Sequence, residues 1–484
     1  MKEVAMNGNK SIHMSSKEFR QYGHSVIDWI ADYYDNIEQY PVKSNVNPGD
    51  IRSSLEKNPP KTGVSMDHIL KDIDRLIMPG ITHWQSPKFF GYFPTNTSGP
   101  SILADLISSG LGVNGMLWET SPACTELETH VLDWIADMLS LPDHFKSKND
   151  GGGVIQDTAS SASLCAMIAG REKKNKGNSN LFGSRENLVV YASSQAHSSI
   201  EKAAKIAGIG SNNIRYIEVN NDFSMNISSL KKQIIKDIGE GYIPFFVCAT
   251  IGTTSSNAID SVNDIGKICA QYKLWMHVDA AMAGTAALCP EYQYMQEGLE
   301  YADSYLFNPH KWMLTNFDCS CLFIKNRDHL VNALSIMPEY LKTKFSKTTK
   351  VIDYRDWQIP LGRRFRSLKL WAVIRYYGIN GLQNYVRNHI DLTQEFLSWI
   401  KNDERFEIIA PAPLNLVCFR ARGSDRLNEE LLQYINNTGE IFITHTKLND
   451  LFTLRFCIGQ THTDIDHIKL AWELIKDGLE RVKK

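Results

Sequence analysis

From about Gly99 onward, short runs of β-branched and aromatic residues alternate with helical stretches, and this alternation constrains the fold more than any other feature of the sequence. Short β-rich runs between helices predict a mostly parallel sheet with helices on both faces. We therefore expect an α/β protein. Strands are expected at residues 188–192, 215–219, 245–250, 274–278, 304–307 and 321–324, and helices at residues 102–111 and 125–141.

The pattern divides the chain into three predicted parts. Residues 1–98 are expected to form an N-terminal helical arm, residues 99–368 a large domain and residues 369–484 a small α+β domain. In the arm, Ser15 and Glu18 have capping-box spacing, and a second helix is expected at residues 65–78. An apolar stripe with helical spacing must be buried, either on a partner subunit, as is common for such an arm, or on its own chain. The stripe is Phe19, Tyr22, Val26, Trp29 and Tyr33.

Composition excludes several classes of function. The chain has 484 residues, 43% hydrophobic and 22% charged, as in ordinary globular proteins. Its net charge of −2 argues against nucleic-acid binding and against a polybasic membrane anchor. No apolar run is long enough to span a bilayer, and the polar N-terminus lacks a signal-peptide core. The nine cysteines form no CxxC pair, so we expect buried free thiols, a cytoplasmic location and no metal site.

Polar residues follow the expected strands, at the carboxyl ends where parallel sheets bind ligands. Asp279 closes the run at 274–278, and Lys311 follows the run at 304–307 in Asn308-Pro309-His310-Lys311-Trp312. Either residue alone has an ordinary explanation, as a helix cap or a surface charge. Together they match pyridoxal 5′-phosphate (PLP) chemistry, because lysine can form a Schiff base with the cofactor aldehyde and aspartate can keep the pyridine nitrogen protonated.

Three further segments at the same predicted edge fit this cofactor. Small hydroxyl residues at 158–161 open a helix, whose backbone N–H groups and dipole suit a phosphate, although an ordinary capped helix is the commoner case. His197 follows the run at 188–192 and can stack on a pyridine face while it hydrogen-bonds to substrate. Thr254 places another hydroxyl after the run at 245–250.

With these residues in view, the chain resembles the group II PLP-dependent decarboxylases, specifically the aromatic L-amino-acid decarboxylases. The resemblance runs from about Ser15 to the C-terminus. It rests on Tyr92-Phe93-Pro94-Thr95, Ser121 to Glu128, Gln156 to Ser160, Ala196-His197-Ser198-Ser199, His277-Val278-Asp279-Ala280-Ala281, Asn308 to Trp312 and Pro360 to Arg366.

The resemblance implies a PLP-dependent transferase of fold type I and an obligate homodimer with active sites at the subunit interface. It makes Lys311 the Schiff-base lysine, Asp279 the pyridinium partner and His197 the stacking residue. Tyr340, in a lysine-rich aperiodic segment expected to be a loop, would reach the partner's site and protonate the substrate carbon. The implied cofactor contacts are Ala159, Ser160, Thr254, Asn308 and His310, and the implied substrate contacts are Trp84, Tyr92, Phe93, Thr95, Asn114, Met116, His197 and Gly362.

The implied reaction is decarboxylation of an aromatic L-amino acid to its amine and carbon dioxide. DOPA, tryptophan, 5-hydroxytryptophan and tyrosine remain open as substrates, because Asn114, Met116 and Met282 depart from residues common in relatives. The alternative is an aromatic acetaldehyde synthase, which couples decarboxylation to oxidative deamination. Relatives of that kind often replace the loop tyrosine or the stacking histidine. Tyr340 and His197 are both present, which favours the decarboxylase.

A basic stretch precedes the expected small domain. Residues 362–371 are expected to open a long helix that continues through Tyr377. Its basic side chains alternate with apolar ones at helical spacing, so a solvated helix face is favoured over a nucleic-acid patch. The basic residues are Arg363, Arg364, Arg366 and Lys369.

Overall fold

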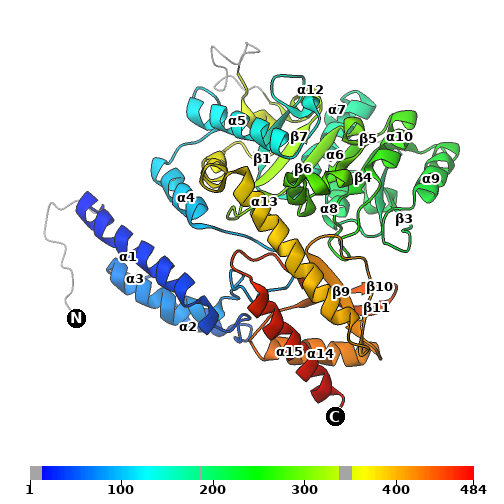
Figure 1. The fold of residues 1–484 in the computed structure, drawn as a ribbon. Helices are drawn as coiled ribbons and strands as arrows, with labels where there is room; N and C mark the ends of the chain where they lie inside the picture. The colour runs from blue at the N-terminus through cyan, green and yellow to red at the C-terminus, as the bar shows by residue number, and fades with distance from the viewer. Residues whose placement is uncertain (1–12, 185–186, 337–350) are drawn as a thin grey trace.

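The computed structural model describes residues 13–184, 187–336 and 351–484. Figure 1 shows a body built on two sheets, with an N-terminal arm that projects from one side of it. None of the helices in these ranges is long and apolar enough to cross a membrane. The arm contains α1 (Ser16–Asp35), α2 (Asp50–Ser54) and α3 (Met66–Asp72).

The large sheet has strand order β1-β7-β6-β5-β4-β2-β3 in the described part of the chain. Strand β7 is antiparallel to its neighbours β1 and β6, and the pairs from β6 to β3 are parallel. The expected mostly parallel sheet is thus confirmed. Its strands are β1 (Gly152–Gln156), β2 (Leu188–Ser193), β3 (Ile214–Ile217), β4 (Ile243–Thr250), β5 (Trp275–Asp279), β6 (Ser304–Phe307) and β7 (Ser320–Ile324).

Helices cover both faces of this sheet because successive strand residues point to opposite sides and both sets are apolar. On β5, Met276 and Val278 lie in one core, while Trp275 packs in the other core, beneath α6. One face is covered by α6 (Ala159–Asn175), α7 (Asn178–Phe182), α8 (Ser199–Ile206) and α12 (Arg327–Leu334). The other is covered by α5 (Pro122–Met138), α9 (Ile227–Gly239), α10 (Val262–Tyr272) and the start of α13 (Arg366–Lys401).

A smaller antiparallel sheet with strand order β10-β11-β9-β8 follows in the C-terminal part of the chain. Helix α13 runs from the large sheet to this small one, as the gold helix of Figure 1 shows. Phe90, from the segment after the arm, stacks on Phe456 with ring centroids 4.1 Å apart. The elements are β8 (Phe406–Ile408), β9 (Leu416–Ala421), β10 (Thr444–Leu448), β11 (Leu451–Cys457), α14 (Asp425–Asn437) and α15 (Ile465–Val482).

The arm confirms the predicted helix start and shows where part of its stripe packs. Ser15 caps α1 in a full capping box with Glu18. The Trp29 indole donates to Asp74 of the same chain at 2.8 Å, and the Tyr33 hydroxyl lies 2.9 Å from His83 Nδ1. These stripe residues therefore contact their own chain. No residue of α1 is fully buried, so the helix keeps another face open.

The structure contains one strand that was not predicted and shifts the start of one predicted helix. Residues 152–156 form β1, a strand that the two glycines in it concealed. The long helix starts at Arg366 rather than near Gly362 and continues to Lys401, with a kink at Gly378. Helix α13 crosses the expected boundary at residues 368/369, so the three-domain division stays a proposal.

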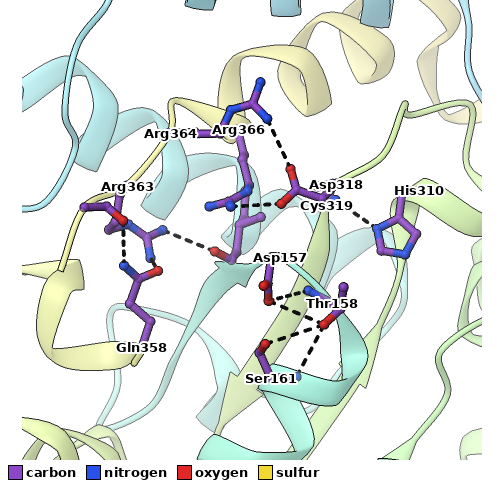
Figure 2. A network of polar contacts seen from close by, with 12 residues as sticks. Asp157, Thr158, Ser161, His310, Asp318, Cys319, Gln358, Arg363, Arg364 and Arg366 are labelled. Atoms are coloured by element: carbon purple, nitrogen blue, oxygen red, sulfur yellow. Dashed lines mark hydrogen bonds and ion pairs between the residues drawn. The ribbon is translucent and has the colours of Figure 1, made fainter. Parts of the chain in front are cut away.

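The expectation of a solvated basic face holds for Arg364, which is exposed, but was wrong for the other three residues. Arg363 is buried in an ion pair with the buried Glu128, and Lys369 is fully buried 3.6 Å from Asp105. Figure 2 shows Arg366 turned toward Asp318, with Nη2 2.9 Å from the carboxylate. A buried cation is stable only beside an anion, and acidic residues from distant segments supply that partner.

Candidate active site

The predicted cofactor residues meet at one edge of the large sheet. Strands β1, β2, β4, β5 and β6 all end there, because they run in the same direction. We call the residues at these strand ends the cofactor edge. They are Ala159 and Ser160 after β1, His197 after β2, Thr254 after β4, Asp279 at the end of β5, and Asn308, His310 and Lys311 after β6.

Lys311 lies on α11 (Pro309–Trp312), a single helical turn that begins directly after β6 and Asn308. Its ammonium nitrogen is 5.3 Å from the centroid of the Phe93 ring. Burial lowers the pKa of Lys311, and the nearby carboxylate of Asp279 opposes that shift. A lowered pKa increases the share of neutral amine, which is the nucleophilic form.

Asp279 is 4% exposed and is fixed by the strand that it ends. Its Oδ1 accepts a hydrogen bond from the Ala281 N–H at 3.0 Å. In the described ranges, no hydrogen bond is found at its other oxygen, Oδ2. The buried carboxylate thus keeps one acceptor for a positively charged partner.

Two histidines of the cofactor edge have a defined tautomer. The backbone N–H groups of Ser199 and Cys319 donate to Nδ1 of His197 and of His310, at 3.1 and 2.9 Å respectively. A ring nitrogen that accepts carries no proton, so each neutral ring carries its proton on Nε2. Burial lowers the pKa of His310 to about 3, and partial burial lowers that of His197, against the effect of Asp279. Both rings are therefore neutral Nε2–H donors near pH 7.

The start of α6 provides an anion-binding end. Thr158 caps the helix, its hydroxyl accepting from the Ser161 N–H at 3.5 Å, as Figure 2 shows. Ala159 and Ser160 follow in the first turn and are partly exposed. Their backbone N–H groups have no partner within the helix, so the first turn can bind a phosphate.

One residue that holds this edge from the small sheet, Arg455, was not predicted. Arg455 on β11 is 4% exposed, and its Nη2 donates to the Thr254 carbonyl at 2.6 Å. Its Nη1 donates to Thr444 Oγ1 at 3.0 Å, and that hydroxyl accepts from the Tyr92 N–H at 3.2 Å. The guanidinium carbon lies 5.6 Å from the Phe93 ring centroid. A single arginine in an otherwise apolar strand was the available signal.

Four of the predicted substrate residues lie beside the cofactor edge. The Asn96 N–H donates to the His310 carbonyl at 3.1 Å, which places Thr95 next to α11. The Phe93 ring lies near both Lys311 and Arg455, whose charged groups are 5.3 and 5.6 Å from its centroid. Trp84 and Tyr92 stack with centroids 5.5 Å apart and form an aromatic pair in the same segment.

The remaining described substrate residues form a separate set, which we call the outer group: Asn114, Met116 and Gly362. Asn114 Oδ1 accepts from the Arg363 N–H at 3.0 Å, and the Met116 carbonyl accepts from the Arg355 N–H at 3.1 Å. A Cβ on Gly362 would meet Asn114 Nδ2 at 3.8 Å. Asn114 and Gly362 are exposed in the single chain.

Buried contacts make the outer group rigid although its tip is exposed. Arg363 Nη1 donates to Gln358 Oε1 at 2.6 Å, shown in Figure 2, and Arg363 is also paired with Glu128. Glu128 in turn accepts from the Ile155 N–H on β1 at 2.8 Å. The outer group is thus anchored to the large sheet. Tyr340 lies outside the described residues.

The residues of the cofactor edge fit PLP. The α6 first turn and the Nε2–H donor of His310 suit the phosphate, Asp279 suits a protonated pyridine nitrogen, and Lys311 suits the aldehyde. The buried Ser199 Oγ and Gln195 Oε1 have no hydrogen-bond partner in the described ranges, which leaves further polar atoms for a ligand beside His197. No group of three or more metal-binding side chains is found in these ranges.

Comparison with known proteins agrees with this geometry. The family model of the pyridoxal-dependent decarboxylase conserved domain matches residues 48–422. Aromatic-L-amino-acid decarboxylase of Mus musculus is 47% identical over 472 residues, 96% of this chain and 98% of that protein. Phenylacetaldehyde synthase of Arabidopsis thaliana is also 47% identical, over 475 residues and 96% of each chain.

The solved structures extend the agreement to the fold. The crystal structure of Oryza sativa TDC with PLP and tryptamine has a TM-score of 0.96 and 38% identity, and the match covers 98% of this chain and 100% of that one. The expected fold type I and the expected cofactor, PLP, are thereby confirmed. The chain belongs to the pyridoxal-dependent decarboxylases.

Proposed function

We propose that this enzyme decarboxylates an aromatic L-amino acid, one of DOPA, tryptophan, 5-hydroxytryptophan or tyrosine, to its amine and carbon dioxide. The observation that carries the proposal is the meeting of Lys311, Asp279 and His197 at one sheet edge, beside an aromatic wall. Phe93 lies 5.3 Å from the Lys311 amine, and the stacked Trp84 and Tyr92 belong to the same segment. Aromatic side chains form favourable stacked and edge-to-face pairs with an aromatic substrate.

Each residue of the cofactor edge has a proposed role. PLP, when bound, supplies a ring that accepts the electron pair left when carbon dioxide departs. Lys311 binds the cofactor covalently, and Asp279 holds a proton at the pyridine nitrogen. His197 stacks on the ring and donates its Nε2–H toward the substrate. The phosphate and the ring are held by Ala159, Ser160, Thr254, Asn308 and His310.

The substrate residues orient the amino acid so that the bond to its carboxylate stands perpendicular to the cofactor ring. Thr95, next to α11, holds the substrate near Lys311. Trp84, Tyr92 and Phe93 pack against its side chain. The outer group of Asn114, Met116 and Gly362 contacts the distal end of the ring.

Tyr340 is proposed to give a proton to the substrate carbon after decarboxylation, and the competing aldehyde synthase activity turns on this residue. Tyr340→Phe keeps the ring and removes the proton donor. The variant should lose amine formation and instead consume dioxygen and water to produce aromatic aldehyde, ammonia, carbon dioxide and hydrogen peroxide. If it makes amine at the parent rate without aldehyde, another group donates the proton, and His197 is the next candidate.

The proposed activity is tested by steady-state assays with DOPA, tryptophan, 5-hydroxytryptophan, tyrosine and phenylalanine, in which amine and aldehyde are both quantified. Stoichiometric amine from at least one hydroxylated or indole substrate is expected. Stoichiometric aldehyde and peroxide from the parent enzyme would instead establish the synthase. If the enzyme turns over none of these five amino acids, the proposal is wrong.

We also propose a homodimer in which each subunit contributes to both active sites. An apolar groove of about 250 Å³ lies between α1 and α4 (Gly99–Leu111) and includes Ile27, Ile30 and Leu103. Leu106 and Ile107 on α4 are 52% and 58% exposed, and a contiguous apolar surface of this kind favours a protein interface. Since Trp29 contacts its own chain, Leu106→Asp is the sharper test, and sedimentation should show monomers. An unchanged dimer would remove α4 from the interface.

We likewise propose three domains: an arm (1–98), a large PLP-binding domain (99–368) and a small domain (369–484). We also propose a cytoplasmic location. The nine cysteines are all buried and free, as is usual in a reducing compartment. Microscopy of a tagged chain tests the location. Calorimetry tests the division, because separate unfolding transitions for the two sheets would support it and a single transition would count against it.

A further inference from the structure

A buried chain of hydrogen bonds lies directly behind the cofactor edge. His277 precedes Asp279 by two residues on β5, so both side chains point to the α6 face of the sheet. The imidazole of His277 is fully buried. Its Nδ1 lies 2.8 Å from Ser304 Oγ on β6, and its Nε2 lies 3.4 Å from Ser163 Oγ on α6.

Trp275 extends this chain of hydrogen bonds, because its indole Nε1–H donates to Ser304 Oγ at 2.8 Å. The Ser304 hydroxyl therefore links the Trp275 indole to the His277 imidazole, and the Ser163 hydroxyl lies at the other ring nitrogen. Burial lowers the pKa of His277 to about 4, against the effect of Asp279, so the ring is neutral near pH 7.

The geometry of α6 explains why this chain reaches the cofactor edge. A Cβ on Gly170 would lie 3.0 Å from the Trp275 ring, so a glycine is required for the helix to pack this closely on β5. Two turns earlier Ser163 lies over His277, and one further turn earlier stands Ala159, at the phosphate-binding start of the helix. Successive turns of α6 therefore pack on successive residues of the same face of β5. The contact between Ser163 and His277 is one step along β5 from Asp279.

We propose that His277 is a positioning residue for the cofactor, a proposal that rests on PLP binding at the cofactor edge. Through Ser163 it fixes the start of α6, which holds the phosphate. Through Ser304 it fixes β6, which leads to Lys311. Because the His277 ring is neutral, the Asp279 carboxylate remains free to pair with the protonated pyridine nitrogen. A positively charged side chain at position 277 would compete with that nitrogen for the carboxylate.

The test measures the bound cofactor rather than turnover alone. Apoenzyme of each variant is reconstituted with PLP, and the apparent Kd and the absorbance maximum of the bound cofactor are recorded. His277→Phe keeps an aromatic ring but makes neither hydrogen bond. It should weaken PLP binding about tenfold and shift the absorbance maximum, because a buried polar contact of this kind contributes about 1.4 kcal/mol.

Three further variants separate positioning from folding. His277→Gln has both an acceptor and a donor and should recover most of the affinity and the parental absorbance. Ser163→Ala and Ser304→Ala leave the imidazole in place and should each weaken PLP binding by a few-fold, so the proposal is tested even if His277→Phe does not fold.

A matched control is Tyr191→Phe, which removes another fully buried strand-to-helix hydrogen bond, from the Tyr191 hydroxyl to Asp237 at 2.8 Å. It should lower stability without altering the PLP Kd or the absorbance. Parental Kd and absorbance in both serine variants would overturn the proposal. Borohydride labelling of Lys311 in the parent tests the cofactor site itself, so the two failures are distinguishable.

Discussion

The cofactor edge and the outer group differ in how much of their environment one chain supplies. At the cofactor edge His197 is exposed, but Asp279, Asn308 and His310 are at most 4% exposed, and each side chain accepts a hydrogen bond from the same chain. Asn114 and Gly362 are exposed, although the buried pair of Arg363 and Glu128 makes their segment rigid. A rigid but uncovered group is suited to complete a site on another molecule. We therefore expect cofactor binding to depend on one chain and, in the proposed homodimer, substrate selection to depend on both.

The largest expected effect is at the cofactor edge. Lys311→Ala should leave a folded protein whose amine formation falls by on the order of 10⁴-fold, because no other amine can replace the covalent attachment. Circular dichroism and an amine assay check this, with Lys267→Ala as the control, since the Lys267 side chain is 58% exposed. Amine formation near the parental rate would remove Lys311 from the chemistry.

Loss of one charge at the same edge should be the next largest effect. Asp279→Asn keeps the size of the side chain but gives the pyridine nitrogen no anion. PLP should bind more weakly and the rate should fall roughly a hundredfold, the usual cost of removing one partner of a buried charge pair. Asp264→Asn, at a half-exposed carboxylate, is the control. An unchanged Kd and rate would place the pyridine nitrogen elsewhere.

A complementation experiment tests the comparison itself. Gly362→Arg should fold, since Gly362 is exposed and only Asn114 stands near it, but it should block substrate. When this variant is co-expressed with Lys311→Ala, half the dimers are mixed, and each mixed dimer has one site with both parts intact. Activity should recover to about a quarter of the parental value. No recovery would mean that the outer group serves the site of its own chain.

The smallest effect concerns acid stability. Because the pKa of His277 is about 4 when folded and about 6.5 when unfolded, the unfolded chain binds a proton first as the pH falls. Stability from the neutral ring is therefore complete above pH 6.5 and is lost between pH 6.5 and 4. The loss is at most about 3 kcal/mol. Thermal unfolding of His277→Gln and the parent across this range should show a difference that narrows toward pH 4. A constant difference would contradict a buried neutral ring.

The sequence predicted the cofactor edge because its residues are local features. Lys311 and Asp279 each follow a recognisable strand, and parallel strands bring such ends together without knowledge of long-range contacts. Arg455 could not be found in this way, because Thr254 is about 200 positions away along the chain. The same reason applies to Arg363 and Lys369. A basic residue on a helical pattern looks solvated until Glu128 and Asp105 are placed beside it.

Strand β1 and the Gly362 segment show a second limit of the sequence. Two glycines lower the strand propensity of residues 152–156, and the strand exists because β7 pairs with it. The helical spacing at residues 362–365 is overridden by hydrogen bonds of Arg363 and Gln358, which hold the backbone outside a helix. The outer group was named by resemblance alone, since Asn114, Met116 and Gly362 follow no strand end and form no pattern of their own along the chain.

Reduction of the holoenzyme with borohydride, followed by peptide mapping, shows whether PLP binds at the cofactor edge through Lys311. We expect a pyridoxyl label on Lys311 and on no other lysine, with loss of the visible absorbance of the enzyme. A label on a different lysine, or an unlabelled Lys311 in fully reduced enzyme, would contradict this expectation.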